Sequence, residues 1–228
     1  MNGKKHPRLS GKVFFITGAS SGIGWATALE LAPYGVRLVL CARRKRLLNE
    51  LSRRIGGQSE TLVLPFDVSV PAAGKRAVRK TLQKWGQIDY LINNAGAIHN
   101  AHFHSQRFEE IENLNRVNYV GPAALIQAVL PRMLDQGRGH IVNVSSIGGV
   151  LGFPFVSGYC ASKFALVGLT EAYENTSFIN EVMAQVNEQA FDWLDAPMVR
   201  VAAANVPMPR AEVLEDLAGV NATGGSAN

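Results

Sequence analysis

The sequence predicts an α/β fold built on a doubly wound parallel sheet. Five short apolar runs alternate with longer stretches of helical periodicity, which is typical of parallel strands joined by crossover helices. A glycine-rich turn joins the first apolar run to the first helical stretch, and glycine suits such a turn because it tolerates tight backbone conformations. The 228 residues are enough for one domain of this class with a substantial core.

The apolar runs are expected to be buried strands, because they lack the alternation of a half-exposed sheet. They cover residues 13–17, 37–41, 61–65, 90–93 and 140–144. Helices are predicted between them at 23–32, 46–55, 71–85 and 108–133, and one more begins near Gly158. The carboxyl ends of such strands converge on one crevice, where distant parts of the chain meet.

Composition excludes several classes of partner. With 47% hydrophobic and 18% charged residues, the chain is typical of a soluble globular protein. The net charge of +5 lies partly in the cluster 43–46, which lacks the interleaved aromatic residues of a nucleic-acid binder, so we expect no nucleic-acid partner. We expect no membrane span, since no apolar run approaches about 20 residues, and no signal peptide. Cys41 and Cys160 are expected to be free thiols in a reducing compartment, the cytoplasm.

The glycine-rich turn predicts a dinucleotide site. It reads Thr17-Gly18-Ala19-Ser20-Ser21-Gly22-Ile23-Gly24, between a strand and a helix. Its glycines allow close approach of the backbone to a pyrophosphate, and the helix N-terminus supplies N–H donors. Three residues separate the first two glycines, in place of one in the usual G-x-G-x-x-G. A purely steric turn is the alternative, which the flanking strand and helix disfavour.

A tyrosine and a lysine form a candidate acid–base pair. Tyr159 and Lys163 are four residues apart, so on a helix they share a face, and Ser146 lies thirteen residues upstream of the tyrosine. The nearby ammonium favours the phenolate, which suits Tyr159 to exchange a proton with a carbonyl or an alcohol. The alternative is a chance Tyr-x-x-x-Lys pair without function.

Taken together, residues from about 9 to about 172 resemble the short-chain dehydrogenase/reductase family. The motifs that carry the resemblance are Thr17 to Gly24, Asn93-Asn94-Ala95-Gly96, Asn118, Ser146, and Tyr159 with Lys163. The resemblance implies a Rossmann-like fold, a nicotinamide cofactor and a catalytic tetrad. In that tetrad Tyr159 is the general acid or base, and Lys163 assists it and binds the nicotinamide ribose. Ser146 holds the substrate oxygen, with Ser145 as the neighbouring alternative, and Asn118 supports a water-linked proton path.

The resemblance also implies the residues that bind the cofactor. They are Thr17, Gly18, Ser20, Ser21, Gly22, Ile23, Gly24, Arg43, Arg44, Asp67, Val68, Asn94, Ala95, Gly96, Tyr159 and Lys163. Two of the assignments have a structural alternative. Asp67 could cap a helix, since aspartate is a good N-cap, and Asn118 could satisfy a helix kink near Gly121-Pro122.

The end of the second predicted strand favours NADP over NAD. Ala42 stands where a carboxylate would bind the adenosine ribose of NAD, and Arg43 and Arg44 follow. A guanidinium suits a 2′-phosphate. A solvated basic loop is the alternative.

Three histidines, His99, His102 and His104, follow the fourth predicted strand. They are expected to line the substrate mouth. A zinc site is disfavoured because no cysteine lies nearby and the loop offers no defined ligand geometry, so we assign no metal ligand.

The carboxyl-terminal part departs from the family pattern. Residues 1–172 are predicted to form the dinucleotide-binding core, 173–217 an atypical tail beside it, and 218–228 a disordered end. Residues 178–217 resemble the tail of the β subunit of the pyruvate dehydrogenase decarboxylating component, which suggests a chimeric or truncated chain. Within this tail, 199–203 is the candidate for a sixth strand.

The predicted function is that of an NADP-dependent oxidoreductase that interconverts a small carbonyl compound and its alcohol, with Tyr159 as general acid or base. The alternatives are a reductase that binds its cofactor but is impaired or truncated, and an interaction protein that acts through its tail. Self-association into a homodimer or homotetramer is expected from the family resemblance.

Overall fold

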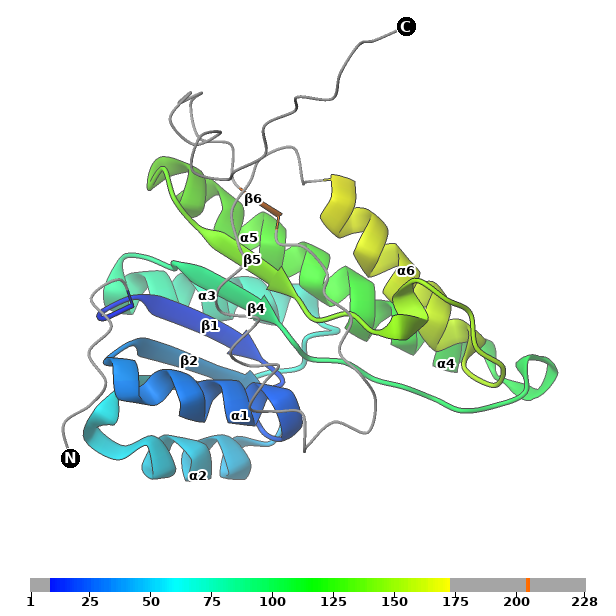
Figure 1. Ribbon diagram of the computed structural model, residues 1–228, viewed down its shortest axis with the longest axis horizontal. Coiled ribbons are helices and arrows are strands. Elements are labelled where there is room, and N and C mark those ends of the chain that lie inside the picture. The colour runs from blue at the N-terminus through cyan, green and yellow to red at the C-terminus, as the bar shows by residue number, and fades with distance from the viewer. Residues whose placement is uncertain (1–8, 173–203, 206–228) are drawn as a thin grey trace, which may run out of the picture.

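The computed structural model describes residues 9–172 and 204–205. Its sheet has the strand order β3-β2-β1-β4-β5-β6, and the first five strands in that order are parallel (Figure 1). Their bounds are β1 Val13–Thr17, β2 Arg37–Ala42, β3 Glu60–Pro65, β4 Tyr90–Asn93 and β5 His140–Asn143. The chain reverses direction across the sheet between β3 and β4, which places the topological switch point beside β1. The predicted doubly wound parallel sheet is therefore confirmed.

Helices cover both faces of the sheet. One face carries α1 (Gly22–Leu31) and α2 (Lys45–Ile55), and the other carries α3 (Pro71–Trp85) and α5 (Gly121–Asp135). Successive residues of β1 supply the two layers in turn, because side chains alternate across a strand. Phe14 packs with the layer that contains α1 and α2, and Phe15 with the layer that contains α3 and α5. Both faces of the sheet are shielded from solvent, which explains why the sequences of the strands are unbroken apolar runs.

The helix predicted over 108–133 is interrupted. It consists of α4 (Phe108–Asn115), a π-helical turn (Arg116–Val120) and α5. Pro122 lies in the first turn of α5, where its missing N–H leaves the preceding turn without a donor. Gly121 lies against the β3–α3 connection, and a Cβ there would come within 2.6 Å of the carbonyl oxygen of Val68. The kink expected near Gly121 is therefore a π turn that contains Asn118.

Helix α6 (Ser157–Ala172) carries the tyrosine and lysine of the candidate pair. Short 3-10 turns complete the described chain at Ala32–Tyr34, Gly56–Gln58, Phe103–Ser105 and Ile147–Gly149.

A chain of buried polar side chains ties α6 to the sheet. Asn93 at the end of β4 donates to Asn143 at the end of β5 (2.9 Å), and Asn143 donates to Thr170 in the last turn of α6 (3.0 Å). Thr170 in turn donates to the carbonyl of Leu166 (2.7 Å). All three side chains are buried, so these bonds replace water that the core excludes.

A two-residue strand, β6 (Ala204–Asn205), pairs antiparallel with β5 at the edge of the sheet. The predicted strand 199–203, the rest of the tail at 173–217 and the end at 218–228 lie outside the described residues. Within the described part, no helix is long and apolar enough to span a bilayer.

Candidate active site

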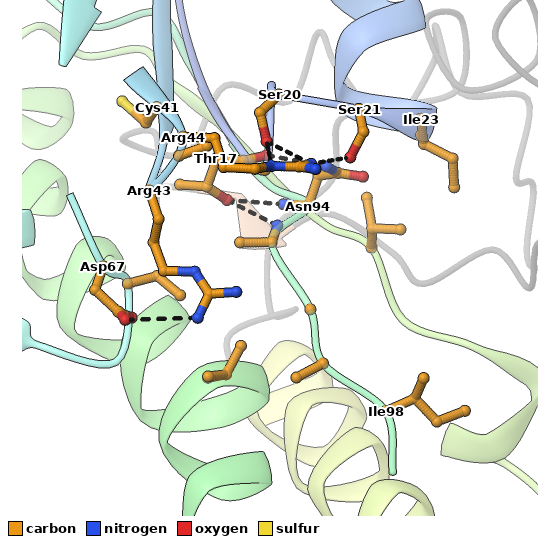
Figure 2. Close-up of a pocket in the computed structure, with 18 of the residues that line it drawn as sticks. Thr17, Ser20, Ser21, Ile23, Cys41, Arg43, Arg44, Asp67, Asn94 and Ile98 are labelled. Atoms are coloured by element: carbon orange, nitrogen blue, oxygen red, sulfur yellow. Dashed lines mark hydrogen bonds and ion pairs between the residues drawn. The ribbon is translucent and has the colours of Figure 1, made fainter. Parts of the chain in front are cut away.

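A cleft of about 550 Å³ opens at the carboxyl ends of the parallel strands. Figure 2 shows side chains from β1, from β2 and from the segment after β4 that converge on it. Predicted site residues that line it are Thr17, Gly18, Ser20, Ser21, Ile23, Arg43, Arg44, Asp67, Val68, Asn94, Ala95, Gly96, Tyr159 and Lys163. Gly22, Gly24, Asn118 and Ser146 are not part of its lining but lie beside residues that are. Residues as far apart in the sequence as Thr17 and Lys163 thus form one site.

The glycine-rich turn needs its glycines for two reasons. A Cβ at Gly18 would lie 2.6 Å from the side-chain nitrogen Nδ2 of Asn94, and one at Gly24 would lie 2.5 Å from the same atom. Gly22 has a positive φ of 55°, and a Cβ there would meet no atom within 4 Å. The turn is therefore packed closely against Asn94, just after β4, and is open to solvent beside the first turn of α1. This open space beside free helix N–H groups fits the pyrophosphate of a dinucleotide.

Thr17 fastens the turn to the segment after β4. Its hydroxyl accepts hydrogen bonds from the backbone N–H groups of Asn94 and Ala95 (3.0 Å each) and donates to the carbonyl of Ile92 (3.2 Å). The Asn94 side chain donates back to the Thr17 carbonyl (2.9 Å). These bonds fix the wall of the cleft that continues to Gly96.

The two arginines after β2 differ in their contacts. The Arg44 guanidinium donates to the hydroxyl of Ser20 through Nε (3.2 Å) and Nη2 (2.9 Å), and to the hydroxyl of Ser21 through Nη2 (2.6 Å). The Arg43 side chain is 78% exposed and, among the described residues, makes only a long ion pair with Asp67, at 3.9 Å. Figure 2 shows the Arg44 guanidinium beside Ser20 and Ser21 and the Arg43 guanidinium beside Asp67. Because the serine hydroxyls accept from Arg44, their own protons stay available to donate to an anion.

Asp67 is not the N-cap of α3. The helix begins at Pro71 with Val70 as its N-cap, and the Asp67 carboxylate accepts from the backbone and hydroxyl of Ser69 (2.9 and 2.7 Å). This turn holds Asp67 and Val68 in the wall of the cleft.

Lys163 is buried at the base of the cleft. Its ammonium donates to the carbonyl of Val144, just after β5 (2.8 Å), and lies 5.9 Å from the centre of the Tyr159 ring. Burial lowers the pKa of Lys163 to about 8. The i, i+4 spacing on α6 brings the two side chains together, and both line the cleft as the sequence predicts.

Asn118 is fully buried and holds the opposite wall. Its carbonyl accepts from the N–H of Ala97 (2.8 Å), and its amide donates to the carbonyl of Ala97 (2.8 Å) and the hydroxyl of Ser162 (2.9 Å). Ser162 donates to the carbonyl of Tyr159 (2.7 Å). Asn118 therefore connects the π turn to the segment after β4 and to α6, and these bonds go to other elements rather than to the backbone of its own kinked helix.

The two neighbouring serines have different surroundings. Ser146 accepts from the N–H of Gly148 (3.1 Å), and a Cβ at Gly148 would come within 3.2 Å of the Tyr159 ring, so this loop lies against the tyrosine. The Ser145 hydroxyl is buried, finds no hydrogen-bond partner among the described residues, and would lie 2.6 Å from a Cβ at Gly149. Ser145 is therefore enclosed behind the loop, although part of the residue lines the cleft.

The histidines lie in the segment that leads out of the cleft. His99 contacts Glu110 (3.2 Å), and the rings of His102 and His104 are 5.3 Å apart. Among the described residues, no group of three or more histidines, cysteines or acidic residues could hold a metal ion.

Sequence reasoning did not identify Ser162, Val144 or Ile98. The first two fix Asn118 and Lys163, and the third lines the cleft. No local pattern signals these roles, because the contacts join residues at least 19 apart in the chain.

A dinucleotide cradle beside a tyrosine–lysine pair, at the switch point of a parallel sheet, defines an oxidoreductase site of the nicotinamide-dependent type. The sequence matches the short chain dehydrogenase family over residues 12–193. The chain therefore belongs to the short-chain dehydrogenase/reductase family, whose members use NAD(P). The match extends beyond residue 172, where the resemblance was expected to end.

Several curated proteins are similar to the chain. Dehydrogenase/reductase SDR family member 7 of Mus musculus is 39% identical over 169 residues, which are 72% of this chain and 50% of that protein. The chain thus spans about half the length of the first relatives it matches. The 3-oxoacyl-(acyl-carrier-protein) reductase FabG of Thermotoga maritima is 34% identical over 223 residues, 93% of this chain and 89% of that protein.

Solved structures agree with the fold. NAD+-bound xylitol dehydrogenase aligns with a TM-score of 0.70 at 32% identity, and the alignment covers 72% of this chain and 64% of that chain. A short-chain dehydrogenase/reductase from Burkholderia phymatum in complex with NAD aligns with a TM-score of 0.70 at 33% identity, over 72% and 59%. The expected similarity of residues 178–217 to a pyruvate dehydrogenase tail finds no support in these comparisons and concerns residues outside the described part.

Proposed function

We propose that the protein interconverts a carbonyl compound and its alcohol, with NADP as the preferred cofactor. The observation that carries this proposal is the pairing of Tyr159 with a buried Lys163 in a cleft that also contains the dinucleotide cradle. Tyr159 gives its hydroxyl proton to the carbonyl oxygen in reduction and receives it back in oxidation. When bound, the reduced cofactor supplies the hydride that the carbonyl carbon accepts, and it is left oxidised.

The chain's own residues position the substrate oxygen and the proton donor. The Ser146 hydroxyl accepts from Gly148 and so keeps its own proton for the substrate oxygen. The ammonium of Lys163 lies 5.9 Å from the centre of the Tyr159 ring, in the same cleft. The Asn118 bonds to Ala97 and Ser162 hold the two walls of the cleft at a fixed spacing.

Three variants test this reaction, and Ser145→Ala is the matched control for Ser146→Ala. Tyr159→Phe keeps the ring and should abolish turnover of ketones and aldehydes while NADPH affinity stays near that of the wild type. Ser146→Ala should lower kcat/KM by about 10²- to 10³-fold, the usual effect of losing a donor to the developing oxyanion. Ser145→Ala should leave turnover nearly unchanged. Equal losses in both serine variants, or full activity in Tyr159→Phe, would contradict the assigned roles.

The preference for NADP rests on the end of β2. Ala42 offers no carboxylate to repel a phosphate, and Arg43 and Arg44 lie at the cleft rim. The long, exposed Arg43–Asp67 pair is worth little, so Arg43 can turn to a 2′-phosphate without a large loss. Arg44 and the two serine hydroxyls that it bonds add further donors. The two similar structures described with NAD contain that cofactor in their own sites, so the preference is a proposal for this chain.

Arg43→Asp should weaken NADPH binding and spare NADH, measured by the enhancement of cofactor fluorescence on binding. A charge-assisted contact is worth about 1.5–3 kcal/mol, which is roughly ten- to a hundredfold in affinity. Arg46→Asp is the matched control, because Arg46 is 83% exposed, pairs with Glu50 and does not line the cleft. A parallel loss for both cofactors in Arg43→Asp would overturn the assignment and make Arg44 the next candidate.

We further propose that the protein assembles as a homodimer or homotetramer. Phe164 of α6 and Val120, just before α5, expose 45% and 37% of their surface. Exposed apolar side chains on long helices favour association with a second copy. Phe164→Glu should shift the mass measured by light scattering toward the monomer, and a monomeric wild type would refute the proposal.

A further inference from the structure

Two loops at one end of the molecule carry a group of exposed apolar side chains. One loop runs from β4 to α4 and the other from the 147–149 turn to α6, and Figure 1 shows them at the same end of the fold. We call these side chains the apolar rim: Ile98, Phe103, Val150, Leu151, Phe153 and Phe155. Their exposed fractions range from 39% for Phe153 to 70% for Phe103. Isolated exposed apolar residues are ordinary, but six on two adjacent loops indicate a binding surface.

The two loops are fastened to each other. The N–H of Ala101 donates to the carbonyl of Phe155 (2.8 Å), and the rings of His102 and Phe155 meet edge to face with centres 4.8 Å apart. Phe155 has a φ of 67° and is the one non-glycine residue with positive φ among the described residues. Such a conformation is unfavourable for a phenylalanine and persists only where its surroundings hold it, often at ligand sites. The Phe155 ring is therefore held in a defined, half-exposed position.

The rim is continuous with the cleft. Ile98 belongs to both, since it lines the cleft and is 61% exposed, and Figure 2 shows it on the segment that leads out of the site. Phe155 stands four residues before Tyr159, the proposed proton donor. The cleft that contains Tyr159 is therefore bordered by a residue of the rim, Ile98.

Charges beside the rim are paired. Arg107 donates to Glu110 through Nη2 (2.8 Å) and Nε (3.0 Å), and His99 contacts the same carboxylate. Glu109 next to them is exposed and negative. Among the described residues of the two loops, no unpaired arginine or lysine is available for an anionic substrate, so the surface favours an uncharged ligand.

We propose that the apolar rim binds the uncharged, apolar body of the substrate, so that the protein acts on carbonyl compounds with a long aliphatic or aromatic part. The proposal rests on the proposed carbonyl–alcohol chemistry at Tyr159. Burial of one methylene group raises affinity about fourfold when it is complete. The specificity constant should therefore rise with the length of the apolar chain until the rim is covered.

The test is a series of methyl ketones from butan-2-one to dodecan-2-one, assayed with NADPH. For the wild type, kcat/KM should rise about two- to fourfold per added methylene over the first part of the series. Ile98→Ser and Phe155→Gly should flatten this rise, so that kcat/KM falls more for dodecan-2-one than for butan-2-one. Phe155→Gly is informative because glycine adopts the positive φ without strain, so the variant should keep the melting temperature of the wild type.

Leu134→Ser is the matched control. Leu134 is 46% exposed near the end of α5 and does not line the cleft, so its loss should leave the chain-length dependence unchanged. A rise that is as steep in the rim variants as in the wild type overturns the proposal. So does a wild type whose kcat/KM does not depend on chain length.

A binding measurement separates this proposal from the proposed reaction. The neutral fluorescent probe N-phenyl-1-naphthylamine should bind the wild type, be displaced by dodecan-2-one, and bind at least about tenfold more weakly to Ile98→Ser and Phe155→Gly. If the probe binds in this way but no ketone is reduced, the rim stands and the reaction is wrong. If short ketones are reduced but the probe does not bind at the rim, the reaction stands and the rim proposal is wrong.

Discussion

Replacement of Lys163 by methionine tests how strongly the fold disfavours the charge that the site needs. Burial lowers the pKa of Lys163 to about 8, against 10.5 for an exposed lysine. Between these values the unfolded chain holds a proton that the native state has lost, so this group makes stability rise with pH from about 8 to 10.5. Below pH 8 the buried charge reduces the free energy of unfolding by its full amount, about 3 kcal/mol at about 1.4 kcal/mol per pH unit.

Lys163→Met removes the charge and keeps a side chain of similar length. It also removes the bond to the Val144 carbonyl, worth about 1.5–3 kcal/mol for a charged donor, so the net effect at pH 7 is small. The change with pH does not suffer from this cancellation. Between pH 7 and pH 10 the free energy of unfolding of the variant should fall by about 2–3 kcal/mol relative to that of the wild type. The reason is that only the wild type loses a buried charge over this range.

Urea unfolding at the two pH values measures this difference, since other titrating groups are common to both proteins. Lys80→Met is the control, because Lys80 is exposed on α3 and its replacement should have the same effect at both pH values. If the difference between the wild type and Lys163→Met is the same at pH 7 and pH 10, Lys163 is not desolvated and the reasoning is wrong.

Two further predictions concern glycines. Gly121→Ala should lower the free energy of unfolding by about 1–3 kcal/mol in urea unfolding, because its Cβ would lie 2.6 Å from the Val68 carbonyl. Gly168→Ala on α6, where a Cβ meets no atom within 4 Å, should instead raise it by up to about 1 kcal/mol, and an equal effect of both would contradict the packing argument. Gly148→Ala should lower kcat while NADPH affinity and stability change little. The reason is that its Cβ would lie 3.2 Å from the Tyr159 ring and would displace it. An unchanged kcat would mean that the ring has room to move.

The sheet could be predicted from sequence because its signal is local and strong. Both faces of β1 are buried, so every residue from Val13 to Thr17 is shielded from solvent and the run stands out from its neighbours. The break in the helix at 116–120 could not be located in the same way. A single π turn lengthens only one turn of the helix, so it leaves no clear mark in the sequence pattern, and the close approach of Gly121 to Val68 on another element accompanies it.

In the candidate site, too, the features that depend on local spacing could be predicted, and the contacts between distant residues could not. The Tyr159–Lys163 pair depends on a spacing within one helix, and the cleft contains both residues as predicted. The bonds of Arg44 to Ser20 and Ser21 join residues more than 20 apart, and no sequence pattern announces which of two adjacent arginines will make them. The positive φ of Phe155 was equally hidden, since phenylalanine gives no signal for that conformation.

The bonds that run from Asn93 through Asn143 to Thr170 have a consequence for how the molecule opens. If α6 moved away from the sheet, the buried amide of Asn143 would lose its Thr170 partner, so we expect the helix and the end of β5 to unfold together. Amide hydrogens near Leu166 should then exchange with solvent as slowly as those of β5. The helix that carries Tyr159 is thus expected to be as rigid as the sheet before any ligand binds, because its packing against the core already orders it.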